Sequence, residues 1–84
     1  MNETTKQHRP IDEIVRDIHT HWERPYFAAV PYLNAMSRLK TKECRYGQES
    51  GGSIIVYFLS NASTFRGEYA RQLKQELKDI IGMK

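Results

Sequence analysis

The chain has 84 residues, of which 39% are hydrophobic and 27% are charged. This composition is typical of a folded globular domain and excludes a disordered tail, and the longest apolar run, Ile54 to Leu59, is much shorter than the roughly 20 residues of a membrane-spanning helix. Thirteen Lys and Arg against ten Asp and Glu give a net charge of +3, which is compatible with an acidic or nucleic-acid partner but does not by itself indicate one.

The first residues differ from the rest of the chain. Residues 1–9 are polar and show no periodic pattern, so we expect a flexible N-terminal arm followed by a single helical domain over residues 10–84. The arm lacks the apolar centre of a secretory signal. The one cysteine, Cys44, cannot form an intramolecular disulfide. Together these features predict a cytoplasmic protein.

Two helices are predicted in the first half of the domain. Apolar residues at helical spacing predict a helix from about Pro10 to Trp22, which Pro25 ends. A second helix is predicted from about Pro31 to Lys40, since proline suits a first helical turn. Residues 41–52 contain three glycines and are expected to form the main loop.

The apolar segment that follows this loop allows two interpretations. Residues 53–60 could form a buried strand in a short hairpin or a buried helix, because periodicity alone does not separate the two in so short a run. Ile55, Phe58, Leu59 and Ala62 fall at helical spacing, and no partner strand is apparent elsewhere. We therefore predict a helix from Gly52 to Ser60 and keep the hairpin as the alternative.

The last predicted helix runs from Thr64 to Ile81, after capping residues at 61–64. Tyr69 is expected to face inward on this helix, because it falls at helical spacing with the apolar positions around it. The predicted fold is thus all-α, a compact small domain of about four short helices. Its predicted core comprises Ile14, Ile18, Leu33, Met36, Phe58, Leu73 and Leu77.

The last helix also carries a basic ridge. Arg71, Lys74 and Lys78 recur at i, i+3 and i+7 and so share one strip of the helix surface. The strip could be an ordinary solvated face, or it could contact phosphate or an acidic protein surface.

A second basic cluster lies where the second helix meets the loop. It comprises Arg38, Lys40, Lys42 and Arg45, with Tyr46 beside them. Cations next to an exposed aromatic ring can hold a backbone phosphate while the ring stacks on a base. A charged, solvated loop is the commoner explanation of such a cluster.

Aromatic residues are dense in one short segment. Trp22, Tyr26, Phe27 and Tyr32 cannot all be buried in so small a domain, so we expect an exposed aromatic patch that marks a protein partner. Tyr26, Phe27 and Tyr46 are the candidate contacts.

The predicted last helix contains a glycine near its start. Gly67 would weaken a first helical turn, and this indicates the close approach of another backbone. Its neighbour Arg66 either belongs to a partner contact or pairs with an acidic residue.

The sequence does not indicate a metal, a cofactor or catalysis. His19 and His21 are two residues apart on a helix and project to different sides, so surface ion pairs with Glu23 and Asp17 explain them better than a shared metal. The sequence contains no recognisable zinc-binding pattern, phosphate-binding glycine loop or Ser/His/Asp arrangement. We predict a non-enzymatic protein without cofactors.

Two stretches resemble small uncharacterised helical proteins encoded by bacteriophages and other mobile genetic elements. They are Trp22 with residues 25–36, and residues 57–68 with Ala70, Arg71, Lys74, Glu76 and Leu77. Phe65 stands where such proteins more often have tryptophan. The resemblance implies a compact accessory protein, in a setting where such proteins assist DNA replication or interfere with a host enzyme, and it implies no catalytic residue.

Two functions follow as hypotheses. The first is an accessory protein of a phage or mobile element that binds a larger protein partner, such as a DNA-processing (replication) enzyme, through aromatic and basic surface. The alternative is direct, weakly sequence-specific DNA or RNA binding through the basic ridge. No membrane partner is expected, and the sequence leaves the oligomeric state open.

Overall fold

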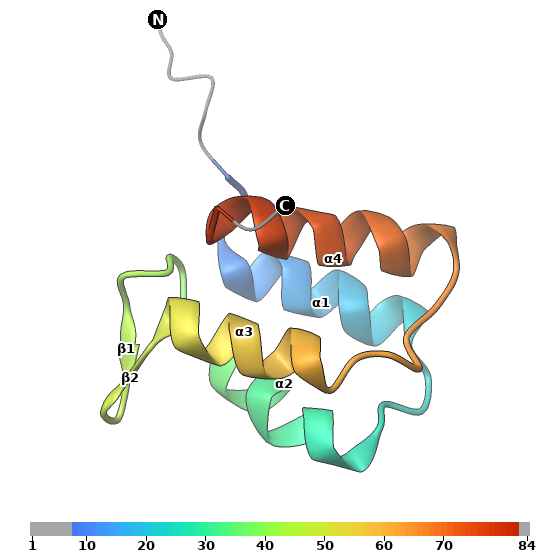
Figure 1. Ribbon diagram of the computed structural model, residues 1–84, viewed down its shortest axis with the longest axis horizontal. Coiled ribbons are helices and arrows are strands. Elements are labelled where there is room, and N and C mark those ends of the chain that lie inside the picture. Colours follow the sequence, from blue (N-terminus) through green and yellow to red (C-terminus); the bar gives the residue numbers. More distant parts are fainter. Residues whose placement is uncertain (1–7, 83–84) are drawn as a thin grey trace, which may run out of the picture.

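The computed structural model describes residues 8–82, which form four helices and one small hairpin. The helices are α1 (Ile11–His21), α2 (Val30–Met36), α3 (Gly51–Ser60) and α4 (Glu68–Ile80), and a short 3-10 helix, η1 (Phe27–Ala29), leads into α2. The strands β1 (Arg45–Tyr46) and β2 (Glu49–Ser50) pair antiparallel just before α3. Helix α1 packs along α4 and α2 packs along α3 (Figure 1). The prediction of a small all-α domain is confirmed.

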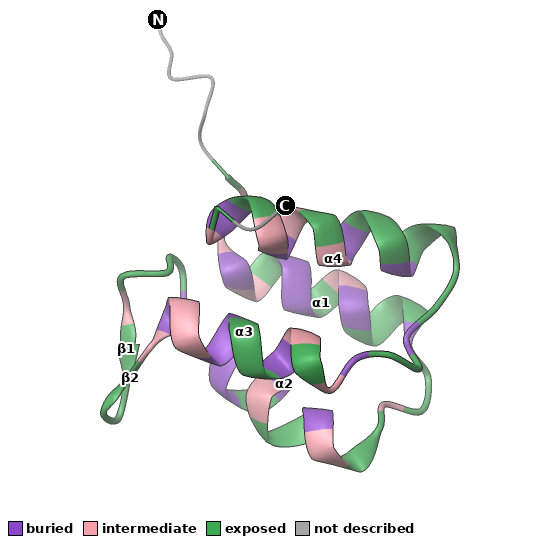
Figure 2. Cartoon of the chain, viewed as in Figure 1, coloured by how far each residue is buried: buried purple, intermediate pink, exposed green. Residues whose placement is uncertain are grey.

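The core lies between the four helices, where their buried positions face one another (Figure 2). All seven predicted core residues are buried. The same periodicity predicted that Tyr69 faces inward, and this prediction is wrong, because its side chain is 59% exposed. It lies at the edge of the apolar strip of α4, where its ring stacks flat on His21 with 3.9 Å between ring centroids. A flanking position of this kind satisfies helical spacing without entering the core.

Helix α2 ends at Met36 and not at the predicted Lys40, because the following residues complete the start of α1. The carbonyls of Leu39 and Lys40 accept hydrogen bonds from the first amides of α1, those of Asp12 and Ile11, at 3.0 and 2.9 Å. The first amides of a helix have no partner within it, and Pro10 provides no side-chain cap. The turn after α2 therefore provides the hydrogen-bond acceptors that the first amides of α1 lack within their own helix.

Residues 53–60 are helical, as predicted, and the hairpin lies earlier in the chain. Ser50 caps α3 by accepting a hydrogen bond from the amide of Ser53 at 3.2 Å. A hairpin at residues 45–50, within the predicted loop, was not expected. It reverses at Gly47, whose positive φ of 65° suits the first position of a tight two-residue turn. Gly51 then brings α3 against the loop, because a Cβ there would lie 2.8 Å from the Thr41 carbonyl oxygen.

Helix α4 begins at Glu68, four residues later than predicted. Gly67 has φ 110° and ψ −179°, a conformation outside the helical region, so the helix cannot extend back through it. Asn61 does not cap α4 but ends α3, where its side-chain amide donates to the Tyr57 carbonyl at 2.9 Å. Phe65 is buried in the intervening turn and stacks on Trp22 at 4.9 Å between centroids.

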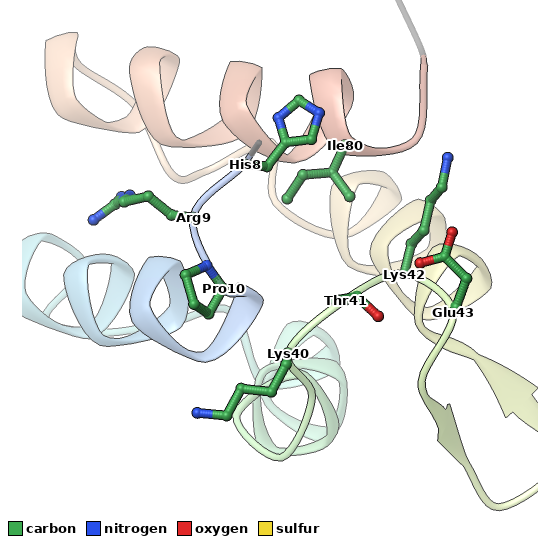
Figure 3. A pocket seen from close by; sticks show the side chains of 8 residues that line it. All are labelled: His8, Arg9, Pro10, Lys40, Thr41, Lys42, Glu43 and Ile80. Atoms are coloured by element: carbon green, nitrogen blue, oxygen red, sulfur yellow. The ribbon is translucent and has the colours of Figure 1, made fainter. Parts of the chain in front are cut away.

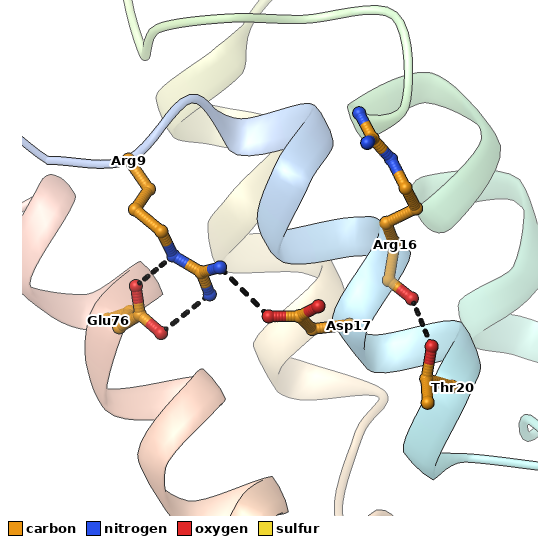
Figure 4. Close-up of polar contacts among 5 residues, drawn as sticks. All are labelled: Arg9, Arg16, Asp17, Thr20 and Glu76. Atoms are coloured by element: carbon orange, nitrogen blue, oxygen red, sulfur yellow. Dashed lines mark hydrogen bonds and ion pairs between the residues drawn. The ribbon is translucent and has the colours of Figure 1, made fainter.

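Arg9 joins the N-terminal segment to the helices. Its guanidinium donates two hydrogen bonds to Glu76 of α4, each 2.9 Å long, and one of 2.8 Å to Asp17 of α1 (Figure 4). Arg9 therefore belongs with the helical domain, although the sequence placed it in the arm. The rest of that predicted arm, residues 1–7, lies outside the described residues.

No helix among residues 8–82 combines the length and the apolar character that crossing a membrane requires.

Candidate functional site

The basic ridge predicted on α4 borders a hollow of about 370 Å³, which runs from the turn before that helix to its last turn. Arg66 from the preceding turn joins the ridge, so four cations surround one concave surface. We call this surface the cationic hollow. Its lining residues are Phe65, Arg66, Gly67, Arg71, Lys74, Gln75 and Lys78.

The cations of the hollow differ in how far they are already engaged. Arg71 forms an ion pair with Glu68, one turn earlier on α4. Arg66 donates from Nε to the Ser63 carbonyl at 3.2 Å, a neutral acceptor that leaves its charge uncompensated. Among the ion pairs of residues 8–82, Arg71 contributes the single one that involves this hollow.

Lys74 occupies the inner position of the hollow. Its Nζ donates to the carbonyl of Ala62 at 3.0 Å and lies 5.9 Å from the centre of the Phe65 ring. Burial lowers the pKa of Lys74, and the positive charges of Lys78 and Arg66 lower it further. This repulsion indicates that the hollow carries unneutralised positive charge, which an anion would relieve.

The second basic cluster is dispersed in the structure. Lys40 forms an ion pair with Asp12 of α1 at 2.8 Å, and this contact lowers the pKa of the Asp12 carboxyl. Arg45 lies on β1 and donates to the Gln48 carbonyl at 2.6 Å, within its own hairpin. Arg38 is exposed in the turn that follows α2. The charges that are close in sequence are therefore directed to different surroundings.

A larger pocket, of about 520 Å³, lies beside this loop but combines both signs of charge. Figure 3 shows that Lys40 and Lys42, which line it, extend in different directions. Glu43 also lines the pocket, and Arg9 on its wall is already paired with two carboxylates. This pocket therefore offers an anion less uncompensated charge than the cationic hollow does.

An apolar cluster is exposed at η1. The ring of Phe27 is 79% exposed and packs edge-on against that of Tyr26, with 5.0 Å between centroids. Val30, one helical turn after Phe27, is also exposed. We call these three residues the apolar cluster. The sequence predicted an exposed patch containing Tyr26 and Phe27, and both residues are exposed.

The cationic hollow begins at Arg66 and Gly67, just before α4, at the same end of the molecule as the apolar cluster. Figure 1 shows α1 and α3 ending there, and η1 and α4 beginning there. Tyr46, the third aromatic candidate, is exposed on the hairpin at the other end (Figure 1).

The structure contradicts two predictions about individual residues, one on the surroundings of Gly67 and one on the partners of His21 and Asp17. A Cβ on Gly67 would meet no atom within 4 Å, so the expected close approach of a backbone is wrong, and the positive φ explains this glycine. The expected partners of His21 and Asp17 are also wrong, since His21 stacks on Tyr69 and Asp17 binds Arg9.

The sequence did not indicate that Val56 and Tyr57 are exposed or that Lys74 is partly buried. Val56 and Tyr57 on α3 are exposed although they lie in the most apolar run of the chain, and Tyr57 packs against Tyr32 at 5.7 Å. The inner position of Lys74 was also missed, because it depends on the path of the turn before α4. Within residues 8–82, no three His, Cys, Asp or Glu side chains are grouped as metal ligands.

Comparison with protein-family models, with curated proteins and with solved structures finds no match for this chain.

Proposed function

We propose that this protein is a non-enzymatic accessory protein that binds a larger protein through the apolar cluster. The observation that carries this proposal is the exposure of Phe27. A phenylalanine ring with 79% of its surface in water, packed against a second aromatic ring, is an energetically unfavourable surface in the free protein.

A protein partner would cover this surface favourably. Burying a phenylalanine side chain contributes about 1.5–3 kcal/mol, and aromatic anchors dominate the energetics of many interfaces. Phe27 and Val30 lie on successive turns of η1 and α2 and present one continuous apolar side to a pocket or groove. The helical backbone fixes both residues, so docking orders few groups.

The partner class follows from the surroundings of the cluster. The cationic hollow, which begins at the same end of the molecule, favours a partner that also handles polyanions. The resemblance to proteins of phages and mobile elements favours the same class. We therefore propose a DNA-processing enzyme, such as a component of a replication complex, as the partner of an accessory protein from a phage or mobile element.

The test is a pull-down from host cells, scored by mass spectrometry for polymerase, primase or helicase subunits. We expect Phe27→Ala to abolish capture of such a subunit. Tyr46→Ala is the control, since it removes an exposed aromatic ring from the opposite end and should leave capture unchanged. Equal capture by the wild type and Phe27→Ala would contradict the proposal.

A second candidate function is direct, weakly sequence-specific DNA or RNA binding through the basic ridge. The observation that favours it is the gathering of Arg66 with Lys74 and Lys78 around one hollow, where their charges repel one another. Anion binding there would not require the apolar cluster.

A further inference from the structure

We infer that the cationic hollow binds nucleic acid through phosphate groups alone, with Arg66, Lys74 and Lys78 as its main contacts. The inference rests on the second candidate function and specifies its site and its chemistry. It is independent of protein docking at the apolar cluster.

The hollow carries positive charge that is mostly unpaired within residues 8–82. Four cations line one surface, and Glu68 offsets the charge of Arg71 alone. Lys74 is held in place by the Ala62 carbonyl, which uses one of the three N–H donors of its ammonium group. The remaining donors, with those of Lys78 and Arg66, are available to oxyanions. Burial and, beyond it, repulsion by Lys78 and Arg66 lower the pKa of Lys74, and an incoming phosphate would relieve the repulsion.

The basic ridge is long enough to contact more than one phosphate. Arg71, Lys74 and Lys78 span seven residues of helix, which is about 10 Å at a rise of about 1.5 Å per residue. A row of this length can contact neighbouring phosphates on one strand. A single small anion would occupy just one part of the row.

No aromatic ring among the described residues that line the hollow is open to a base. Phe65 lines it but is 1% exposed, and Lys74 lies over the ring. Its face is therefore closed to a base. Tyr69 is exposed on α4, but it does not line the hollow, and one face of its ring stacks on His21. Without a free aromatic face the site lacks the stacking that favours single strands, so the duplex and the single strand should bind through the same phosphate contacts.

Acidic protein segments are the competing ligand for such a hollow. The spacing favours nucleic acid, because phosphates recur regularly along a strand and each carries a full charge. Polyglutamate serves as the probe for the competing class. Tighter binding of polyglutamate than of an oligonucleotide of equal charge would overturn the inference.

The experiment is a fluorescence-anisotropy titration of a labelled mixed-sequence DNA oligonucleotide, as a single strand and as a duplex, between about 50 and 200 mM salt. Three phosphate contacts give a slope of about −2.7 in log affinity against log salt for the duplex, which is a roughly 40-fold loss over this range. Removing two contacts with Arg66→Gln and Lys78→Gln together should reduce that loss to roughly 3- to 4-fold. Neither Arg66 nor Lys78 takes part in the hydrogen bond between Lys74 and the Ala62 carbonyl, so we expect this bond to persist in the double variant.

Two further variants make the result specific to the hollow. Arg38→Gln with Lys42→Gln removes the same net charge from the dispersed cluster and should leave the salt slope unchanged. Glu68→Gln frees Arg71 from its ion pair and should tighten binding several-fold, an effect that misfolding would not produce. Equal weakening by both double variants, tighter binding of the single strand than the duplex at every salt concentration, or no binding by the wild type at about 50 mM salt would each overturn the inference.

Discussion

The two basic regions of this protein carry similar charge in the sequence but differ in how the fold arranges it. On α4 the side chains of Arg71, Lys74 and Lys78 project from one rigid strip, and the turn before the helix adds Arg66. In the loop after α2 the cations follow an irregular backbone, so Lys40 reaches α1 and Arg45 stays within the hairpin. A regular helix concentrates charge, whereas an irregular loop distributes it among separate partners.

The largest effect should come from removing the packing beneath the cationic hollow. Leu73 is buried on the inner side of α4, so Leu73→Ala should destabilise the protein by about 2–5 kcal/mol in chemical denaturation. The exposed Tyr69→Leu on the same helix is the control and should cost much less. A cost below that of the control would show that α4 does not depend on this contact.

The loop region should be most sensitive at Gly51. A Cβ there would lie 2.8 Å from the Thr41 carbonyl oxygen and 3.1 Å from the Lys42 Cα, so backbone must move. We expect Gly51→Ala to cost about 1–3 kcal/mol in denaturant unfolding. Gly52→Ala is the matched control, since its nearest neighbour would be 3.8 Å away. Similar stabilities of the two variants would contradict the close approach.

Gly67 tests the turn that brings Arg66 to the hollow. Its φ of 110° and ψ of −179° lie in a region that glycine alone occupies readily. Gly67→Ala should cost about 1–3 kcal/mol by thermal or denaturant unfolding, although no atom would contact the new Cβ. A neutral effect would show that the turn can adopt another conformation.

A smaller effect should appear in the pKa of Lys74. Lys78→Gln removes one of the two positive charges that lower this pKa, so the pKa should rise toward its ordinary value, with the contribution of burial remaining. NMR titration of the Lys74 side chain measures this directly. Lys42→Gln, which removes a loop cation, should leave it unchanged.

The smallest effect should come from the ion pair of Asp12 and Lys40. Lys40 lowers the folded-state pKa of Asp12, so the pair stabilises the protein above the unfolded pKa and this contribution disappears as the pH falls through the folded pKa. Asp12→Asn should therefore weaken the loss of stability below about pH 4, as followed by acid unfolding. It should not tighten oligonucleotide binding, in contrast to Glu68→Gln. Tighter binding would assign a phosphate contact to Lys40.

The same contrast explains how much the sequence could predict. On a helix the direction of a side chain follows from its position, so the buried Leu73 and Leu77 and the strip of Arg71, Lys74 and Lys78 could be derived from spacing. Positions at the edge of the apolar strip remain ambiguous, and Tyr69 was placed on the wrong side for this reason.

Features that depend on tertiary contacts could not be derived from spacing. The end of α2 is set by the first amides of α1, which donate hydrogen bonds to the carbonyls of Leu39 and Lys40. The start of α4 is set by the backbone angles of Gly67, and the same turn places Arg66 beside the ridge and the Ala62 carbonyl beside Lys74. A loop cation has no such geometric rule, so the dispersal of the second cluster required the structure.

The most direct test of the cationic hollow is an NMR titration of isotope-labelled protein with an unlabelled mixed-sequence DNA duplex at low salt. The account predicts that the largest changes in amide chemical shift fall on residues 65–67, 71, 74, 75 and 78, which line the hollow. Residues 38–45 should show little change. Changes centred on residues 38–45, or spread evenly over the surface, would contradict the account.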